Sequence, residues 1–233
     1  DRRVAGRDTR LRGRLRVTCT DNFAHYYLAP HFARFASIHP EIDLDIITRY
    51  QHLSLARREA DVAIRTTRDP PPTLIGRRLL TFALAAYAAP TFVDALPDEP
   101  DPAGLTWIGW ENEAYNRITI TDHFPTANIR HRADSLVEMH ALARAGLGVA
   151  MLGCFSADTD PGLRRVYARP VTETAMDLWV LSHPDVRRAA RVRAFSSFMA
   201  EAILADRALF EGRRPYPDTV TRGTGHATGR GSD

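Results

Sequence analysis

Segments with the two-residue period of a β-strand alternate with segments that have the spacing of an α-helix, and this alternation strongly constrains the fold. The first strand is expected at 15–20 (LRVTCT), and the helix after it ends at Pro40. The order is strand 15–20, helix 23–38, strand 42–47, helix 53–59 and strand 61–65. This order predicts a parallel sheet with helices packed on it.

A second α/β unit follows a proline-rich break at 69–72 (DPPP). Its strands are expected at 74–79, 82–88, 107–110, 128–131 and 149–152, and its helices at 90–96 and 136–145. The last strand of the chain is expected at 176–182 and the last helix at 186–204. Asp21 and Asn22 are expected to cap the first helix of the chain. Asp134 and Ser135 are expected to cap the helix at 136–145, because short polar side chains accept hydrogen bonds from the free N–H groups of a first turn.

The basic residues are all arginine and are concentrated at the two ends of the chain. Seven of them lie in 1–16 against two acidic residues, and four lie in 213–233 against two. The remaining 20 arginines face 24 acidic residues, so the body carries a net charge of −4 although the whole chain carries +3. Since nucleic-acid binding needs a basic surface, residues 17–212 are not expected to bind nucleic acid.

Length and apolar content indicate an ordinary globular protein. The 233 residues, 44% of them hydrophobic, suffice for one large domain or two lobes. The longest apolar runs, such as 82–90 and 147–152, are far shorter than the roughly 18–20 residues that span a bilayer. The first residues lack the apolar region of a secretory signal, so a cytoplasmic protein is expected.

Four blocks of the sequence, taken in order, resemble the effector-binding domain of the LysR-type transcriptional regulators. They read GRLRVTCTDNFAHYYLAPHFARFASIHPEIDLDI, DVAIRTTRDPPPTLIGRRL, ADSLVEMHALARAGLGVAMLGCFSAD and DLWVLSHPDVRRAARVRAFSSFMAEAI. The similarity runs from about Gly13 to Ile203. It implies an α/β fold of two Rossmann-like lobes joined by two crossover strands, similar to type 2 periplasmic-binding proteins, with a small-molecule cleft between the lobes.

The resemblance also implies the division of the chain into lobes and its binding partners. Residues 1–13 resemble the end of a linker to a DNA-binding domain, 14–68 and 185–211 would form lobe I, 69–184 would form lobe II, and 212–233 is expected to be a disordered tail. The implied partners are a small-molecule effector, DNA through an upstream helix-turn-helix domain outside this chain, and further copies in a homodimer or homotetramer. No membrane partner is implied.

Open parallel sheets bind ligands at the carboxyl ends of their strands, where helix N-termini supply free N–H groups. With the resemblance, this rule places the ligand-binding candidates at Thr20, Asp21, Asn22, Phe23, Arg49, Tyr50, Arg65, Trp110, Asp134 and Ser135. Plain N-capping without ligand contact is the alternative for Asp21, Asn22, Asp134 and Ser135.

Arg65 and Trp110 each have a structural alternative. Arg65 ends a predicted strand and suits bidentate binding of an anionic effector, but it would equally pair with Asp61 or Asp69 and hold the hinge. Trp110 lies near a strand end, where its ring would line the cleft, whereas Trp107 is expected in the core.

The sequence contains none of the motifs that would indicate catalysis or a cofactor. GxSxG, GxxxxGK[ST], GxGxxG and CxxC are absent, and no histidine pair has metal-ligand spacing with a carboxylate partner. We therefore expect no enzyme activity, metal or cofactor. Cys19 and Cys154 are expected to be small buried side chains, with a thiol–disulfide sensor as the alternative. A solute-binding protein of the same fold, serving a transporter, is the alternative function.

Overall fold

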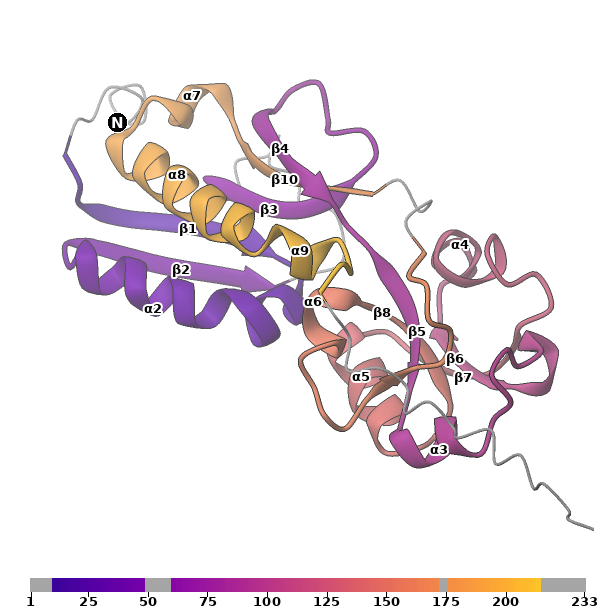
Figure 1. Ribbon diagram of the computed structural model, residues 1–233. Coiled ribbons are helices and arrows are strands. Elements are labelled where there is room, and N and C mark those ends of the chain that lie inside the picture. The colour runs from indigo at the N-terminus through magenta and orange to yellow at the C-terminus, as the bar shows by residue number, and fades with distance from the viewer. Residues whose placement is uncertain (1–9, 49–59, 172–175, 215–233) are drawn as a thin grey trace, which may run out of the picture.

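The computed structural model describes residues 10–48, 60–171 and 176–214 and shows two lobes, each built on a five-stranded sheet (Figure 1). The strand order is β2-β1-β3-β10-β4 in lobe I and β7-β6-β8-β5-β9 in lobe II. The strands of lobe I are β1 (Gly13–Cys19), β2 (Ile42–Thr48), β3 (Val62–Thr67), β4 (Ile75–Thr81) and β10 (Asp177–Ser182). Those of lobe II are β5 (Leu84–Ala88), β6 (Thr106–Trp110), β7 (Asn128–Ala133), β8 (Val149–Gly153) and β9 (Arg164–Arg165). The predicted two-lobed α/β fold is confirmed.

Helices cover the faces of both sheets. Those of lobe I are α1 (Asp21–Phe23), the π-helix η2 (Ala24–Leu28), α2 (Ala29–Ile38), α7 (Pro184–Arg187), α8 (Ala190–Ala205) and α9 (Arg207–Phe210). Those of lobe II are α3 (Pro90–Asp94), the 3₁₀-helix η4 (Pro102–Gly104), α4 (Glu113–Asn116), the π-helix η5 (Arg117–Thr121), α5 (Leu136–Arg144) and α6 (Cys154–Ala157). Helices α2 and α8 lie side by side over the sheet of lobe I (Figure 1).

Aromatic rings form the contact between α2 and α8. The ring of Phe35 meets that of Phe195 with centroids 5.1 Å apart, and the ring of Phe32 lies 6.1 Å from the same residue. Phe35 is fully buried and Phe32 is 9% exposed. Both phenylalanines therefore belong to the core of lobe I.

The division of the chain between the lobes differs from the predicted one. Strands β4 and β10, assigned by the sequence to lobe II, pair with each other and with β3 in the sheet of lobe I. The proline-rich segment at 69–72 is a turn between two strands of one sheet, with the N–H of Leu74 donating to Pro71 at 2.9 Å. Prolines reveal a turn but do not reveal which sheet the next strand joins. The chain crosses to lobe II at Phe82 and Ala83, after β4.

The predicted helix at 23–38 is interrupted by a wider turn. The N–H of Ala29 donates to Ala24 five residues earlier, which makes η2 a π-helix. Pro30 follows in the first turn of α2 and has no N–H to donate, so the ladder of hydrogen bonds is broken there. The predicted helix at 186–204 is likewise divided into α7 and α8. The predicted helix at 53–59 and most of the expected tail lie outside the described residues.

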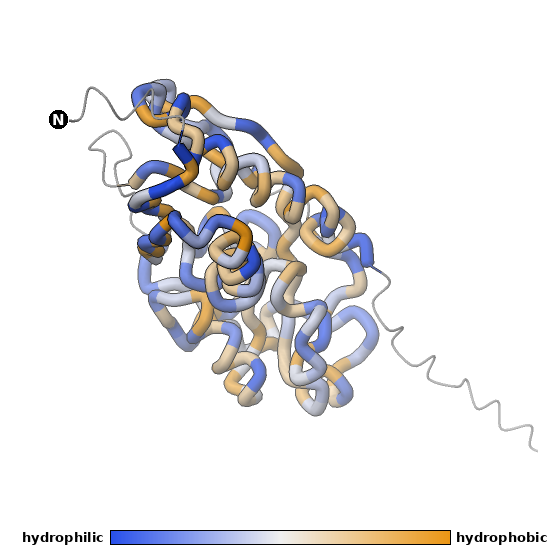
Figure 2. The backbone as a smooth tube through the Cα atoms, turned by 90° about the vertical axis from the view of Figure 1, so that its left-hand side faces the viewer, coloured by the Kyte–Doolittle hydropathy of each residue, from blue (hydrophilic) through white to orange (hydrophobic). Residues whose placement is uncertain are grey.

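Polar and apolar residues alternate over short stretches of the backbone in both lobes (Figure 2). In the described ranges, no helix is both long and apolar enough to cross a membrane.

Candidate functional site

The carboxyl end of β1 leads directly into the helical turn at Thr20, Asp21 and Asn22. Thr20 is the N-cap residue, so the predicted cap at Asp21 and Asn22 is wrong by one position. The Thr20 hydroxyl donates to Oδ1 of Asn22 at 2.6 Å instead of capping the helix, and the N–H of Asn22 donates to Oδ1 of Asp21 at 2.6 Å. These polar groups satisfy one another within the turn. The second carboxylate oxygen of Asp21, Oδ2, bonds to a partner residue of lobe II.

Ser135 of lobe II is that partner. Its hydroxyl donates to Oδ2 of Asp21 at 2.6 Å, and its oxygen accepts from the N–H groups of Val137 at 3.2 Å and Glu138 at 3.4 Å. Ser135 therefore caps α5, as predicted, and also joins lobe II to lobe I. The expected cap at Asp134 is wrong, because the capping oxygen comes from Ser135.

Phe23 lies inside an aromatic cluster where the two lobes meet. Its side chain is 2% exposed, and its ring stacks on Phe155 of α6 with centroids 4.7 Å apart. Phe82, at the crossover, and Phe210, in α9, lie 5.7 Å and 6.1 Å from the Phe23 ring. The cluster anchors the start of α1 to lobe II and to the end of the described chain.

A second aromatic contact between the lobes involves His140, which the sequence analysis did not single out. The ring of Tyr26 in η2 stacks on His140 of α5 with centroids 4.3 Å apart, and Nε2 of His140 lies 2.9 Å from Oδ2 of Asp160. His140 is only 2% exposed. Burial lowers its pKa more than the neighbouring Asp160 carboxylate raises it. In the sequence, the only indication that His140 contributes to this contact was its position within the apolar face of the helix predicted at 136–145.

Arg65 pairs with neither of the acidic residues proposed from the sequence. Its Nη2 donates to the hydroxyl of Thr18 at 3.2 Å, and Oδ2 of Asp61 accepts from the main-chain N–H of Arg16 instead. Burial lowers the pKa of Arg65, against the smaller opposing effects of Cys19 and Tyr115. The ion pair with Asp61 or Asp69 is therefore wrong, and no other ion pair of Arg65 is found among the described residues.

Trp110 packs in the core of lobe II. It is 7% exposed, and its ring meets Tyr115 with centroids 5.4 Å apart. The side chain of Asn116 bonds to both main-chain groups of Trp110, at 2.6 Å and 2.8 Å, and thereby fixes the end of β6. Trp107 is fully buried, as expected, and donates from Nε1 to the carbonyl of Pro102 at 3.0 Å.

The two cysteines are free and buried. Burial raises the pKa of Cys19 to about 12 and that of Cys154 to about 11. The thiol is consequently protonated at neutral pH in both residues, whereas redox sensors need a thiolate. Their environment matches the expectation of small buried side chains.

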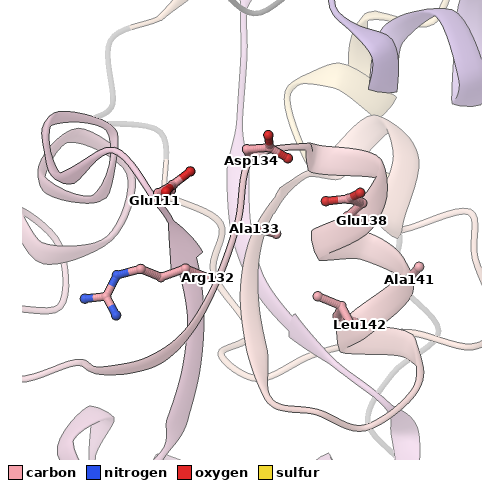
Figure 3. Close-up of a pocket in the computed structure, with 7 residues that line it drawn as sticks. All are labelled: Glu111, Arg132, Ala133, Asp134, Glu138, Ala141 and Leu142. Atoms are coloured by element: carbon pink, nitrogen blue, oxygen red, sulfur yellow. The ribbon is translucent and has the colours of Figure 1, made fainter.

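A pocket of 640 Å³ lies on lobe II between β7 and α5 (Figure 3). It is lined by Glu111, Arg132, Ala133, Asp134, Glu138, Ala141 and Leu142. Of the predicted ligand contacts in the described part of the chain, only Asp134 borders it, and no described residue of lobe I does.

The structure thus brings together part of the predicted site. Asp21, which lies in one turn with Thr20 and Asn22, bonds to Ser135 across the lobes, and Trp110 packs in the core of lobe II. Two further candidates, Arg49 and Tyr50, lie outside the described residues.

Comparison with known proteins places this fold in one family. The model of the LysR substrate binding domain matches residues 8–203. The chain is 27% identical to the Mau operon transcriptional activator of Paracoccus denitrificans over 80% of the chain and 64% of that protein. It is 24% identical to the regulator PtxR of Pseudomonas aeruginosa over 88% of the chain and 66% of that protein. The chain therefore spans about two thirds of the length of these relatives.

Solved structures show the same fold. The regulatory domain of CrgA, a LysR-type regulator from Neisseria meningitidis, superposes with a TM-score of 0.71 at 21% identity, over 82% of this chain and 98% of that one. The effector domain of AmpR from Pseudomonas aeruginosa superposes with a TM-score of 0.70 at 21% identity, over 84% and 97%. These relatives are transcriptional regulators, which favours that function over a solute-binding protein of a transporter. The chain belongs to the LysR substrate-binding domain family.

Proposed function

We propose that a small-molecule effector binds between the lobes, where Asp21 bonds to Ser135 beside Thr20 and Asn22. The observation that carries this proposal is the 2.6 Å hydrogen bond between Asp21 and Ser135, which links the two lobes through side chains at a strand end and at a helix N-terminus. A ligand that inserts there replaces this bond with its own contacts and alters the balance between closed and open lobes. It acts only through its different affinity for the two states, a coupling of typically ~1–3 kcal/mol.

In the full-length regulator, this change would be transmitted to DNA-binding domains. We infer a cytoplasmic homodimer or homotetramer in which an upstream helix-turn-helix domain reads the DNA and this domain senses the effector. The net charge of −4 between residues 16 and 213 supports such a division of tasks, because a surface that binds phosphate groups is basic. The domain itself would bind its effector without chemical change.

A thermal-shift screen of small metabolites tests the effector site. The wild-type chain is compared with Thr20→Ala and Ser135→Ala, each of which removes one hydroxyl from the junction. Ser37→Ala is the matched control, since the Ser37 hydroxyl bonds only to the carbonyl of Arg34 on the exposed side of α2. A true effector raises the melting temperature of the wild type and of the control by mass action, and much less that of the two junction variants.

The size of the loss follows from the bonds removed. A lost hydrogen bond weakens binding by about 0.5–1.5 kcal/mol, which is up to roughly tenfold in Kd. A metabolite that stabilises all four proteins equally binds elsewhere and would refute the proposed site.

A further inference from the structure

Two buried N–H groups without acceptors lie next to each other in lobe I. Four buried side-chain nitrogen atoms lack a hydrogen-bond partner among the described residues: Arg65 Nε, His123 Nε2, His140 Nδ1 and Trp179 Nε1. Natively buried polar groups are nearly always bonded, so each exception calls for an explanation. The exceptions at Arg65 and Trp179 belong to one place in the fold.

Strand pairing brings these two residues together. β3 and β10 are antiparallel, and Trp179 stands directly opposite Arg65 in their register. Residues in that relation project from the same face of a sheet with Cβ atoms about 4.5–5.5 Å apart. Thr18 of β1, which bonds to Arg65 at 3.2 Å, adds a third strand to this face.

Both groups can only donate hydrogen bonds. A guanidinium carries five N–H bonds and no acceptor, and an indole carries one N–H bond and no acceptor. No acceptor among the described residues satisfies them, whereas a bound ligand with an acceptor group would. Because the guanidinium is also charged, the matching acceptor is an anion, and a carboxylate suits its planar fork of donors.

The carboxylates near Arg65 already have partners. Asp61 accepts from the main chain of Arg16, and Asp177 is held by Arg78 on the adjacent strand, with Nη2 of Arg78 2.7 Å from its Oδ1. No acidic side chain among the described residues forms an ion pair with Arg65. Arg65 is half-buried and its Nε is fully buried, so the lack of a counter-charge among the described residues is unfavourable.

Arg165 shows how the same protein buries an arginine for structural purposes. Its guanidinium donates twice to Asp158, at 2.9 Å and 2.6 Å, and further bonds reach the carbonyls of Ala168 and Gly212. Arg65 has one side-chain partner, and that partner is neutral. The Arg165 site therefore has its counter-charge within the protein, whereas the Arg65 site has none among the described residues and suits a bound anion.

We propose that Arg65 and Trp179 bind the carboxylate group of the effector. This inference rests on the proposed effector site and names the chemical class of its ligand, a small organic carboxylate. The acid group would lie against β3 and β10, and the rest of the molecule would extend toward Thr20, which follows β1 two residues beyond Thr18.

Binding of simple carboxylates to the 233-residue chain tests the inference without knowledge of the natural effector. Melting temperatures are measured in sodium formate, acetate and benzoate against sodium chloride at equal ionic strength, with benzamide as the neutral counterpart of benzoate. Wild type is compared with Arg65→Gln and Trp179→Phe. Arg77→Gln is the control, because Arg77 is exposed on β4 of the same sheet.

We expect benzoate, and not benzamide or chloride, to stabilise the wild type and the Arg77→Gln control. Arg65→Gln should weaken benzoate binding by about tenfold or more, since bonds to charged groups are the stronger ones. Trp179→Phe should weaken it less and abolish the benzoate-induced change in tryptophan emission. Equal effects of benzoate and benzamide, an unchanged response in Arg65→Gln, or no response to any carboxylate would overturn the inference.

Stability without ligand provides a second measurement. Arg65→Met should leave the melting temperature unchanged or raise it, because it removes a half-buried charge that has no counter-charge among the described residues. A marked decrease would assign Arg65 a structural role instead. A further outcome is a neutral metabolite that stabilises Thr20→Ala and Ser135→Ala less than the wild type, but Arg65→Gln as much as the wild type. That result would support the proposed effector site and refute the inference that the effector is a carboxylate.

Discussion

Asp21 and Ser135 join the two lobes through one hydrogen bond of 2.6 Å, and the serine oxygen simultaneously caps α5. The same hydroxyl thus donates across the lobes and accepts within lobe II. Any movement that separates the lobes breaks the first interaction and leaves the second intact. This bond is therefore a direct link between the start of α1, the start of α5 and the relative position of the lobes.

The first prediction concerns the energy of this link. In a double-mutant cycle with Asp21→Ala and Ser135→Ala, we expect a coupling free energy of about 1–2 kcal/mol, because the acceptor is a carboxylate and the bond is partly buried. Ser135→Ala also removes the cap of α5, at about 0.5–2 kcal/mol, but the cycle cancels that contribution. Urea denaturation measures all four proteins. Asp134→Ala serves as the control for loss of an acidic residue beside the cap, and a coupling near zero would contradict the link.

The sequence predicted one side of this junction better than the other. Ser135 was identified as the cap of α5 from its residue type and its position before an apolar run, and such local rules need no knowledge of the fold. The cap of the first helix was misplaced because Thr20, Asp21 and Asn22 are all suitable cap residues. Which one serves depends on the bonds among these side chains and on Ser135 in the other lobe.

Features that depend on long-range pairing could not be predicted. Period-two and period-3.6 patterns located most strands and helices, but the assignment of β4 to lobe I follows from its pairing with β10, about a hundred residues later. The opposition of Arg65 and Trp179 has the same origin. The stacking of Tyr26 on His140 depends on how the lobes approach each other, and neither residue carries a motif that announces it.

The second prediction is that stability falls in mild acid because of His140. Burial lowers its pKa below the ordinary value of 6.5, so the folded state holds the neutral imidazole. Between the folded pKa and 6.5 the unfolded chain binds more protons, and stability therefore rises with pH in this window. The contribution is fully present above 6.5 and is lost as the pH falls toward the folded pKa.

Melting temperatures between about pH 5 and pH 8 measure this effect. His140→Phe keeps a ring against Tyr26 but does not titrate, so its melting temperature should depend less on pH than that of the wild type. His31, whose pKa burial also lowers, should account for part of the remaining slope, and His31→Phe is the comparison. A slope unchanged by His140→Phe would show that other groups control the acid response.

The third prediction concerns the buried ion pair of lobe II. The side chains of Arg165 and Asp158 are only 6% and 4% exposed, and the Tyr87 hydroxyl donates to the same carboxylate at 2.7 Å. Asp158→Ala should destabilise the protein by about 3–5 kcal/mol, because it leaves a buried guanidinium without its counter-charge. Urea denaturation gives the value. The double variant Asp158→Leu/Arg165→Met should recover much of the loss, and failure to do so would assign the stabilisation to the attraction itself.

The last prediction is that the chain dimerises through the exposed side of α2. The resemblance to LysR-type regulators implies that this helix pairs with the edge of the other lobe in a second copy, and a twofold dimer is the commonest homo-oligomer. Phe32 and Phe35 are buried in the core and cannot form this surface, whereas Ile38 at the end of α2 is 51% exposed. We expect sedimentation at ~100 μM to show a dimer and Ile38→Asp to shift it toward monomer. Leu11→Asp, at another exposed apolar residue, should leave the dimer intact, and a wild-type monomer at this concentration would refute the pairing.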